Sequence, residues 1–346
     1  GATLDLQATQ TFATLDLDGT ISNTAGTSAL TISGTASIGG SVTTSGTQDY
    51  EGAVTLTGHS TFTTSSAQVT FDSTINSEGS ETNNFTVTAS ELQLDGIVGG
   101  SRTLGVMDIN GTLDLNAAIT NATSIDVSST STLAANVTTS GTQTYNGATT
   151  LETADRNLTA STVNFGDTIT GTGSHDLTIT GALDLDGAMT QVVELTVTST
   201  TDLGANVTTS GTQSYTGAVT LSDDITLTTT NNNVTFSGTV DSDAIGTKRD
   251  LTLTLGSGSA TFSGIVGSTS LADITLNSSV TFAAAVTADN LTIAASKTAT
   301  VKDDVTIASN ITLNNSSTLE VINTSAMTIS GTILENGGSA SSTLIT

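Results

Sequence analysis

Aspartate pairs stand beside leucines in two places where a cation could bind. Asp16 and Asp18 lie in the segment LDLDG, and Asp184 and Asp186 lie in a second copy of it. Side chains alternate between the two faces of a strand, so both carboxylates of a pair point to one outer face. If such segments stacked, their oxygens would suit Ca²⁺. The calcium-binding repeat G-G-x-G-x-D is absent. We therefore expect solvated carboxylates before a glycine turn, with Ca²⁺ as the alternative and no other cofactor.

Residues typical of enzyme active sites are few and scattered. His59 and His175 are the two histidines, there is no cysteine, and the Lys and Arg residues number six in 346 positions. Enzymes that cleave glycosidic bonds need paired carboxylates at a defined separation. The sequence has neither G-x-S-x-G nor a glycine-rich phosphate loop. We predict that the chain is not an enzyme, and keep a carbohydrate-active β-helical enzyme or a tailspike-like polysaccharide binder as the alternative.

One fifteen-residue motif occurs three times, at 42–56, 137–151 and 207–221. Its copies read VTTSGTQDYEGAVTL, VTTSGTQTYNGATTL and VTTSGTQSYTGAVTL. Near-copies at unequal offsets indicate internal duplication of long units built from a shorter period. Tyr50, Tyr145 and Tyr215 recur at one motif position. They could form a platform on which sugars stack, or each ring could pack inside a corner of its own coil. We expect packing, because the copies are far apart in the chain.

Outer threonines, such as those of Thr226-Leu227-Thr228, suggest another use. Regular ranks of threonine on a solenoid can match the lattice of ice. In this chain the residue at the middle of the short apolar triplets varies among Thr, Asp, Asn and Gln. The sequence therefore favours the other interpretations over an ice-binding surface.

The charge is strongly acidic, with 32 Asp and Glu residues and a formal net charge of −26. Nucleic-acid binding requires clustered Lys and Arg, which are missing, and anionic membranes are disfavoured for the same reason. No apolar run is long enough to span a bilayer. Without cysteine there is no disulfide framework or thiolate metal site. We expect neither nucleic-acid binding nor membrane insertion.

The elements that position these residues are short apolar triplets, such as Leu30-Thr31-Ile32 and Val69-Thr70-Phe71. Alternation with period two predicts a short strand with one buried and one solvated face. Gly, Asn, Ser or Asp follows each triplet, as turns require. No segment shows helical spacing, so almost no helix is expected.

Three such strands make a coil of about 20 residues, in the range of repeat architectures. A string of antiparallel sandwiches would need longer strands and linkers between domains. The absence of proline suits strands that are hydrogen-bonded on both sides. We predict an all-β fold, a single elongated parallel β-helix (β-solenoid) with three short strands per coil, running as one continuous rod over residues 1–346.

The third motif copy and the segments after it carry a resemblance. Gly211 to Leu221, Val234 to Val240 and Asp250 to Thr254 resemble the rod repeats of filamentous-haemagglutinin-like and autotransporter-type bacterial surface proteins. The resemblance covers about Val42 to Val286. It implies a right-handed β-helix, a secreted or surface-exposed location, and an adhesive or structural role without a catalytic motif.

The sequence therefore predicts an extracellular structural or adhesive protein, the stalk or repeating subunit of a microbial cell-surface fibre. Strand pattern begins by Leu4 and neither end has an atypical cap, which predicts a part of a longer chain or a subunit that stacks end to end. Expected partners are copies of the chain, end to end or lateral, and surface glycans. A Ca²⁺- or ice-binding surface is a further alternative.

Overall fold

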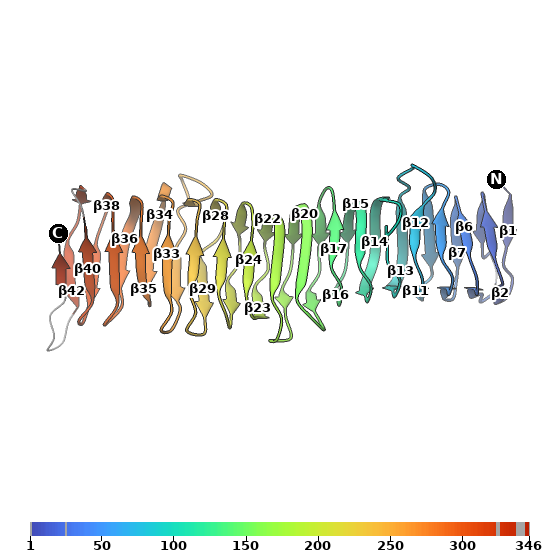
Figure 1. Cartoon of the computed structure of the whole chain (residues 1–346), viewed down its shortest axis with the longest axis horizontal. Helices are drawn as coiled ribbons and strands as arrows, with labels where there is room; N and C mark the ends of the chain where they lie inside the picture. The colour runs from blue at the N-terminus through green and yellow to red at the C-terminus, as the bar shows by residue number, and fades with distance from the viewer. Residues whose placement is uncertain (1, 25, 323–325, 337–342, 346) are drawn as a thin grey trace. The chain divides into compact units, whose positions relative to one another are not determined.

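The computed structural model describes residues 2–24, 26–322, 326–336 and 343–345. The chain divides into two compact units, Gly1–Thr172 and Gly173–Thr346. Each unit is a stack of short strands, and the described residues contain no helix (Figure 1). The prediction of an all-β chain is confirmed.

The first unit holds the strands numbered up to β21. Their bounds are β1 Thr3–Asp5, β2 Gln10–Phe12, β3 Leu15–Leu17, β4 Thr20–Ser22, β5 Leu30–Ile32, β6 Ala36–Ile38, β7 Ser41–Thr44, β8 Gln48–Tyr50, β9 Val54–Leu56, β10 Ser60–Thr64, β11 Gln68–Phe71, β12 Ile75–Ser77, β13 Phe85–Leu94, β14 Leu104–Leu115, β15 Ile119–Val127, β16 Ser131–Leu133, β17 Val137–Thr139, β18 Gln143–Tyr145, β19 Thr149–Leu151, β20 Arg156–Phe165 and β21 Ile169–Thr170.

The second unit holds the strands from β22 onward. Their bounds are β22 Leu177–Leu185, β23 Met189–Val192, β24 Leu195–Val197, β25 Thr201–Leu203, β26 Val207–Thr209, β27 Gln213–Tyr215, β28 Val219–Leu221, β29 Ile225–Thr229, β30 Val234–Phe236, β31 Val240–Ser242, β32 Leu251–Thr254, β33 Ser259–Phe262, β34 Val266–Leu276, β35 Ser279–Phe282, β36 Val286–Ile293, β37 Thr298–Val301, β38 Val305–Ile307, β39 Ile311–Asn314, β40 Thr318–Val321, β41 Met327–Ile329, β42 Ile333–Asn336 and β43 Thr343–Ile345.

In the regular coils each short strand pairs with the strand three places later in the chain. In the first coils β3 pairs with β6, β6 with β9, and β9 with β12, and all three pairings are parallel. Three strands therefore complete one turn, as the triplet pattern predicts. The turns number about 16 in all, with roughly 20 residues in each. The parallel β-solenoid is confirmed, whereas its right-handed winding and its continuity as one rod stay predictions.

Alternation along a strand decides which side chains enter the core. In β9, Val54 and Leu56 are buried while Thr55 between them is partly exposed, and β28 repeats this with Val219, Thr220 and Leu221. Threonine is β-branched and suits the outer side of a pleated strand. The apolar outer pair of each triplet therefore fills the interior, one coil above another.

The largest side chains of that interior are aromatic rings, and several of them stack. In the second unit Tyr215, Phe236, Phe262 and Phe282 follow one another on successive coils, with ring centroids 5.1, 4.5 and 4.9 Å apart. The interplanar angles are 11°, 8° and 15°, so the rings keep nearly one orientation. Because parallel pairing holds identical positions in register, like residues meet like residues along the stack.

Several strands continue around a corner, which the triplet pattern does not predict. Strand β13 runs from Phe85 to Leu94 and pairs with β10 in its first half and with β11 in its second. The register shifts between Thr88 and Glu91. The residues between them, Ala89 and Ser90, include no glycine, asparagine or aspartate that would favour a tight turn. Hydrogen bonding therefore passes around the bend instead of stopping at it.

Candidate functional site

The predicted cation ligands lie apart. Asp16 is exposed on β3, and its register partners on the next three coils are Ser37, Thr55 and Asn76. Asp18 is exposed in the turn that follows. This column therefore offers one carboxylate followed by hydroxyls and an amide, rather than the stacked carboxylates that the sequence suggested.

Asp184 has an acidic neighbour in register. It faces Asp202 on the next coil, and Thr220 follows in the column. Partial burial and the nearby charges of Asp186 and Asp202 raise the pKa of Asp184. Among the residues that the structure describes, no group of three or more His, Cys, Asp or Glu side chains could hold a metal ion. Ca²⁺ at Asp184 and Asp186 stays a prediction, since it usually takes about six to eight oxygens.

The histidines and the buried arginine have structural partners. His59 accepts the backbone N–H of Asn84 on its Nδ1 at 3.0 Å, and the carbonyl of His175 accepts the N–H of Val193 at 2.9 Å. Arg156 is 5% exposed and donates to the carbonyl of Glu152 at 2.8 Å. Burial lowers the pKa of Arg156. These hydrogen bonds, through the side chains of His59 and Arg156 and through the backbone of His175, link neighbouring segments of backbone.

The recurring motif builds a buried corner rather than a binding platform. In the third copy Gln213 donates from Nε2 to the carbonyls of Val207 and Thr228, at 3.4 and 3.0 Å. The hydroxyl of Tyr215 donates to Gln213 Oε1 at 3.1 Å. Thr209 donates to the carbonyl of Gly211 at 2.9 Å. The polar groups of the corner thus satisfy one another.

The other two copies repeat these bonds, from Gln48 and Tyr50 and from Gln143 and Tyr145. All three tyrosines are 0% exposed, and burial raises the pKa of each hydroxyl. The packing interpretation is confirmed. Sequence reasoning missed the glutamine, although it stands two residues before the tyrosine in every copy.

Two copies within the first unit lie on different faces of the coil. Tyr50 is in register with Phe71, and this column continues through Leu94, Leu115 and Leu133 to Leu151 of the second copy. Tyr145 instead belongs to the column of Val127, Ile109, Val87, Phe62 and Val42. The second copy is therefore displaced by one strand relative to the first, and the motif forms the same network at two different corners of the coil.

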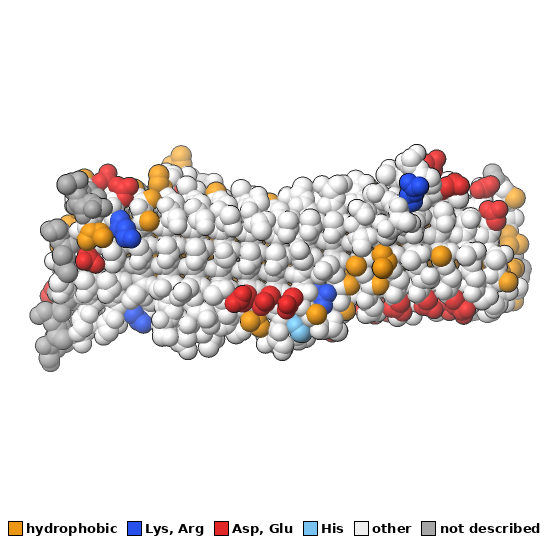
Figure 2. Space-filling model, in the orientation of Figure 1, with side chains coloured by type: hydrophobic (Ala, Val, Ile, Leu, Met, Phe, Trp, Pro, Cys, Tyr) orange, Lys and Arg blue, Asp and Glu red, His pale blue; other side chains and the backbone are white. Residues whose placement is uncertain are grey.

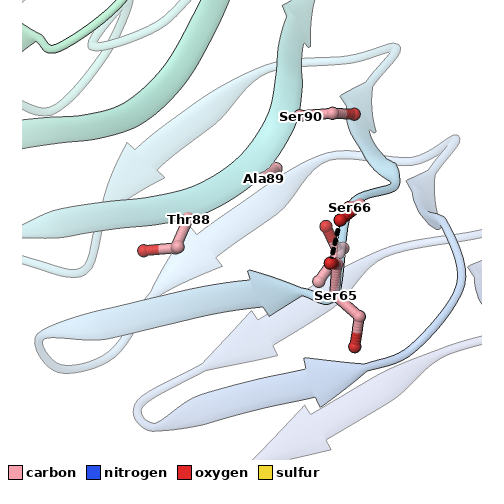
Figure 3. A pocket seen from close by; sticks show the side chains of 6 residues that line it. Ser65, Ser66, Thr88, Ala89 and Ser90 are labelled. Atoms are coloured by element: carbon pink, nitrogen blue, oxygen red, sulfur yellow. Dashed lines mark hydrogen bonds between the residues drawn. The ribbon is translucent and has the colours of Figure 1, made fainter.

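Two shallow hollows open on the first unit. The one in Figure 3, of about 260 Å³, is lined by Thr64, Ser65, Ser66, Thr88, Ala89 and Ser90, and Ser66 donates a hydrogen bond to the carbonyl of Ser65. The other, of about 250 Å³, lies between residues 79–82 and 101–103 and contains Glu81 and Arg102. Hydroxyl groups dominate the first hollow, and neither contains a histidine.

An acidic ridge follows one corner of the first unit. Glu51, Asp72 and Asp95 come directly after β8, β11 and β13, and each backbone N–H donates to the coil below. Asp49 lies beside them, and partial burial together with Asp72 and Glu51 raises its pKa. Figure 2 shows a row of acidic side chains over the N-terminal coils. Like charges at coil spacing repel, so this ridge destabilises the coil stack at neutral pH.

A second row of Asp and Asn side chains joins coils in the second unit. Asp224 accepts the N–H of Asp250, and Asp250 accepts that of Asp273, at 3.0 and 2.9 Å. Asn290 continues the row by accepting the N–H of Asn310 at 3.0 Å. Each side chain thus satisfies a corner donor of the next coil, as Asx residues do at turns. Burial and the neighbouring aspartates raise the pKa of Asp250, against a hydrogen bond that lowers it.

One face of the second unit carries hydroxyls instead of charges. The strands β24, β27, β30, β33, β35 and β37 lie in register one above another. Their outward central residues form what we call the hydroxyl face: Thr196, Ser214, Thr235, Thr261, Thr281 and Thr300. A second column of outward threonines, Thr226, Thr252, Thr275, Thr292 and Thr312, lies on β29, β32, β34, β36 and β39.

The comparisons with known proteins give no relative. No protein-family model matches the chain, and no curated protein or solved structure matches it either. The described residues include no helix with the length and hydrophobicity of a membrane span.

Proposed function

We propose that this chain is an extracellular structural or adhesive protein that forms the stalk or the repeating subunit of a microbial cell-surface fibre. The observation that carries the proposal is the regular parallel pairing of one coil with the next, seen for example at β27, β30 and β33. A solenoid of this kind is extended by adding coils, because each coil contacts only its neighbours. Such an architecture suits a role in which reach matters more than an enclosed site.

The side-chain arrangement supports the same role. Apolar residues and aromatic rings fill the interior, and the motif corners are closed by buried hydrogen bonds of Gln48, Gln143 and Gln213. A net charge of −26 favours solubility and keeps copies apart laterally. Association of copies into a fibre must overcome this repulsion. Salt screens it, so association is expected to increase with ionic strength.

Immuno-electron microscopy of the native cells tests the proposal. Antibodies against the purified chain are expected to label thin fibres outside the cell, and brief proteolysis of intact cells is expected to remove the label. A cytosolic marker protein, which should resist the same proteolysis, is the control. Label confined to the cell interior would contradict the proposal.

The self-association part needs a separate measurement. Sedimentation of the purified chain at low and at high salt compares its state when the repulsion is strong and when it is screened. Assemblies that grow with salt support a filament subunit. A single monomeric species at every salt concentration favours a stalk segment within a longer polypeptide over a subunit that stacks.

A further inference from the structure

We propose that the hydroxyl face of the second unit binds ice. The face is six strands wide, and its central column consists of Thr196, Ser214, Thr235, Thr261, Thr281 and Thr300 in register. The ligand is a lattice of water molecules, and the inference does not depend on the fibre proposal.

Most hydroxyls of this column are free to bind water, and Thr300 is the exception, because its hydroxyl donates to Glu320 at 3.3 Å. Thr196, Thr235, Thr261 and Thr281 are partly or largely exposed, and their hydroxyls make no hydrogen bond to another described residue. This differs from Thr112 and Thr130 in the first unit, whose hydroxyls bond to each other at 3.2 Å. Each free threonine offers one hydroxyl and one methyl group at a nearly fixed χ1 angle, so both repeat from coil to coil.

The spacing is set by the backbone in both directions. Neighbouring parallel strands lie about 4.8 Å apart, and alternate residues along a strand are about 6.7 Å apart. The residues two places before the central column include Thr212, Ser259, Ser279 and Thr298, and those two places after it include Thr198, Thr216, Ser237 and Ser263. The remaining residues at these places are Glu194, Asn233, Ala283 and Lys302, so the three ranks are uncharged and mostly hydroxyl over the four coils of β27, β30, β33 and β35. Over these coils they form a two-dimensional array with repeats of the same order as those between oxygens in ice.

The array is held on a rigid support. Directly beneath it lie the stacked rings of Tyr215, Phe236, Phe262 and Phe282, which are at most 1% exposed. Their planes differ by 15° or less between successive coils. Because the rings hardly rotate from one coil to the next, the strands above them repeat with little twist, as lattice matching over several coils requires.

The charge distribution favours a neutral ligand. In a chain with net charge −26, no ionisable side chain occupies the central column from Thr196 to Thr300. The row that contains β22 and β25 is different, since Asp184 and Asp202 adjoin there. A second column without charge lies on β29, β32, β34, β36 and β39, where Thr226, Thr252, Thr275, Thr292 and Thr312 are in register. Charged groups orient water strongly around themselves, whereas uncharged hydroxyls and methyls can join an existing lattice. The hydroxyl face differs from this second column in its support, because stacked rings lie beneath the hydroxyl face and Leu and Ile side chains lie beneath the other.

The buried position of the aromatic rings decides against the main competing ligand. Flat or crystalline polysaccharides are commonly bound by exposed rings, and Tyr215 and Phe236 are 0 and 1% exposed. The face offers hydroxyls and methyls only. This composition fits a water lattice better than a sugar surface.

Ice recrystallisation inhibition and thermal hysteresis of the purified chain test the proposal. The unaltered chain is expected to inhibit recrystallisation. The variants Thr261→Lys and Thr281→Lys, which place a long charged side chain in the array, are expected to lose activity about tenfold or more. The matched control is Thr220→Lys on β28, whose register partners Asp202 and Asp241 are charged, and it is expected to stay within about twofold. Circular dichroism and melting temperature establish that all three variants are folded.

Three results would overturn the proposal. The first is no inhibition by the folded, unaltered chain. The second is equal loss in Thr220→Lys and Thr261→Lys, since the effect would then not depend on the hydroxyl face. The third is binding to crystalline cellulose or chitin, or self-association in sedimentation, that Thr261→Lys abolishes while ice is unaffected. In that case the face serves a polysaccharide or a second copy instead.

Discussion

At the scale of single residues, the structure turns a sequence motif into a hydrogen-bond network. The glutamine of the motif is the centre, because one amide side chain serves two backbone carbonyls and one tyrosine hydroxyl. In the third copy, Gln213 is 1% exposed and Tyr215 is 0% exposed. Buried polar groups without partners are costly, so the network is a condition for burying this corner at all.

Replacing the glutamine is therefore expected to cost more than replacing the tyrosine. Gln213→Ala leaves Tyr215 and two carbonyls without their partner, and we expect a loss of about 2–4 kcal/mol in the free energy of unfolding. Tyr215→Phe removes one bond, and we expect a loss of about 1 kcal/mol. Denaturant unfolding and amide hydrogen exchange of the second unit measure both. A larger effect of Tyr215→Phe would show that the glutamine is not the centre.

The ring stack permits a second comparison at this scale. Phe262 stacks on Phe236 on one side and on Phe282 on the other. Among the described residues, Phe282 stacks only on Phe262. Truncation of a buried Phe to Ala costs about 3–5 kcal/mol, and each aromatic pair adds about 0.5–1.5 kcal/mol. Phe262→Ala is expected to be the more damaging variant by about 1 kcal/mol. Equal melting temperatures for the two variants would assign the stability to burial alone.

At the scale of elements, close stacking of coils explains why some corners need glycine. A Cβ atom added at Gly217 would lie 2.4 Å from the carbonyl oxygen of Ser199 on the coil below, which is closer than real contacts allow. Ser199 and Gly217 are already joined there by a backbone hydrogen bond of 3.1 Å. The glycine is needed for the approach of two coils rather than for an unusual φ angle.

Gly217→Ala is accordingly expected to destabilise the second unit by about 1–3 kcal/mol, as overpacking does. The matched control is Gly246→Ala in the loop after β31, where an added Cβ would have no atom within 4 Å. We expect the control to change stability by no more than about 0.5 kcal/mol. Thermal unfolding of both variants measures the difference. If Gly217→Ala left the stability unchanged, the coils could separate locally at little cost in free energy.

At the scale of the whole molecule, charge is the main destabilising influence that solution conditions can change. Asp49, Asp184 and Asp250 have a pKa raised above the ordinary value of 3.8, in each case mainly through partial burial and further through nearby carboxylates. A carboxyl with a raised pKa takes up its proton more readily in the folded state. Folding is therefore favoured as the pH falls from neutral toward 3.8.

The melting temperature is expected to rise as the pH is lowered from 7.5 to 5, a range above the sequence pI of about 4.1. Asp5 and Asp243 have a pKa lowered chiefly by hydrogen bonds, so their stabilising effect is lost only below 3.8. Added salt should raise the melting temperature at pH 7.5 and flatten its dependence on pH. A melting temperature that falls steadily on acidification within this range would contradict the conclusion that these carboxylates destabilise the fold at neutral pH.

Asp250→Asn provides the control. Asn290 and Asn310 already fill this role in the same row by accepting a backbone N–H, so the substitution keeps the acceptor and removes the charge. The variant should be more stable than the unaltered chain at pH 7.5 and should show a weaker response to pH.

The strands and the interior could be predicted from the sequence alone because both depend on local pattern. Period-two alternation in triplets such as Val54-Thr55-Leu56 decides which side chains are buried, whatever coil lies above. Glycine, asparagine and aspartate between triplets mark the turns, and the missing proline agrees with pairing on both sides. These signals were enough for an all-β parallel solenoid with three strands per turn.

The arrangement of residues on each face was decided only by the tertiary structure. Register partners on neighbouring coils are 18 residues apart at Ile32 and Tyr50 but 26 apart at Phe236 and Phe262, so no fixed period predicts them. Bends such as that of β13 and the loop between β31 and β32 absorb the difference. The sequence therefore determined that outer positions are Thr, Ser, Asp or Asn. The pairing of coils decided which of these residues align, so that hydroxyls form columns such as Thr196 to Thr300 and Asp184 meets Asp202 in another row.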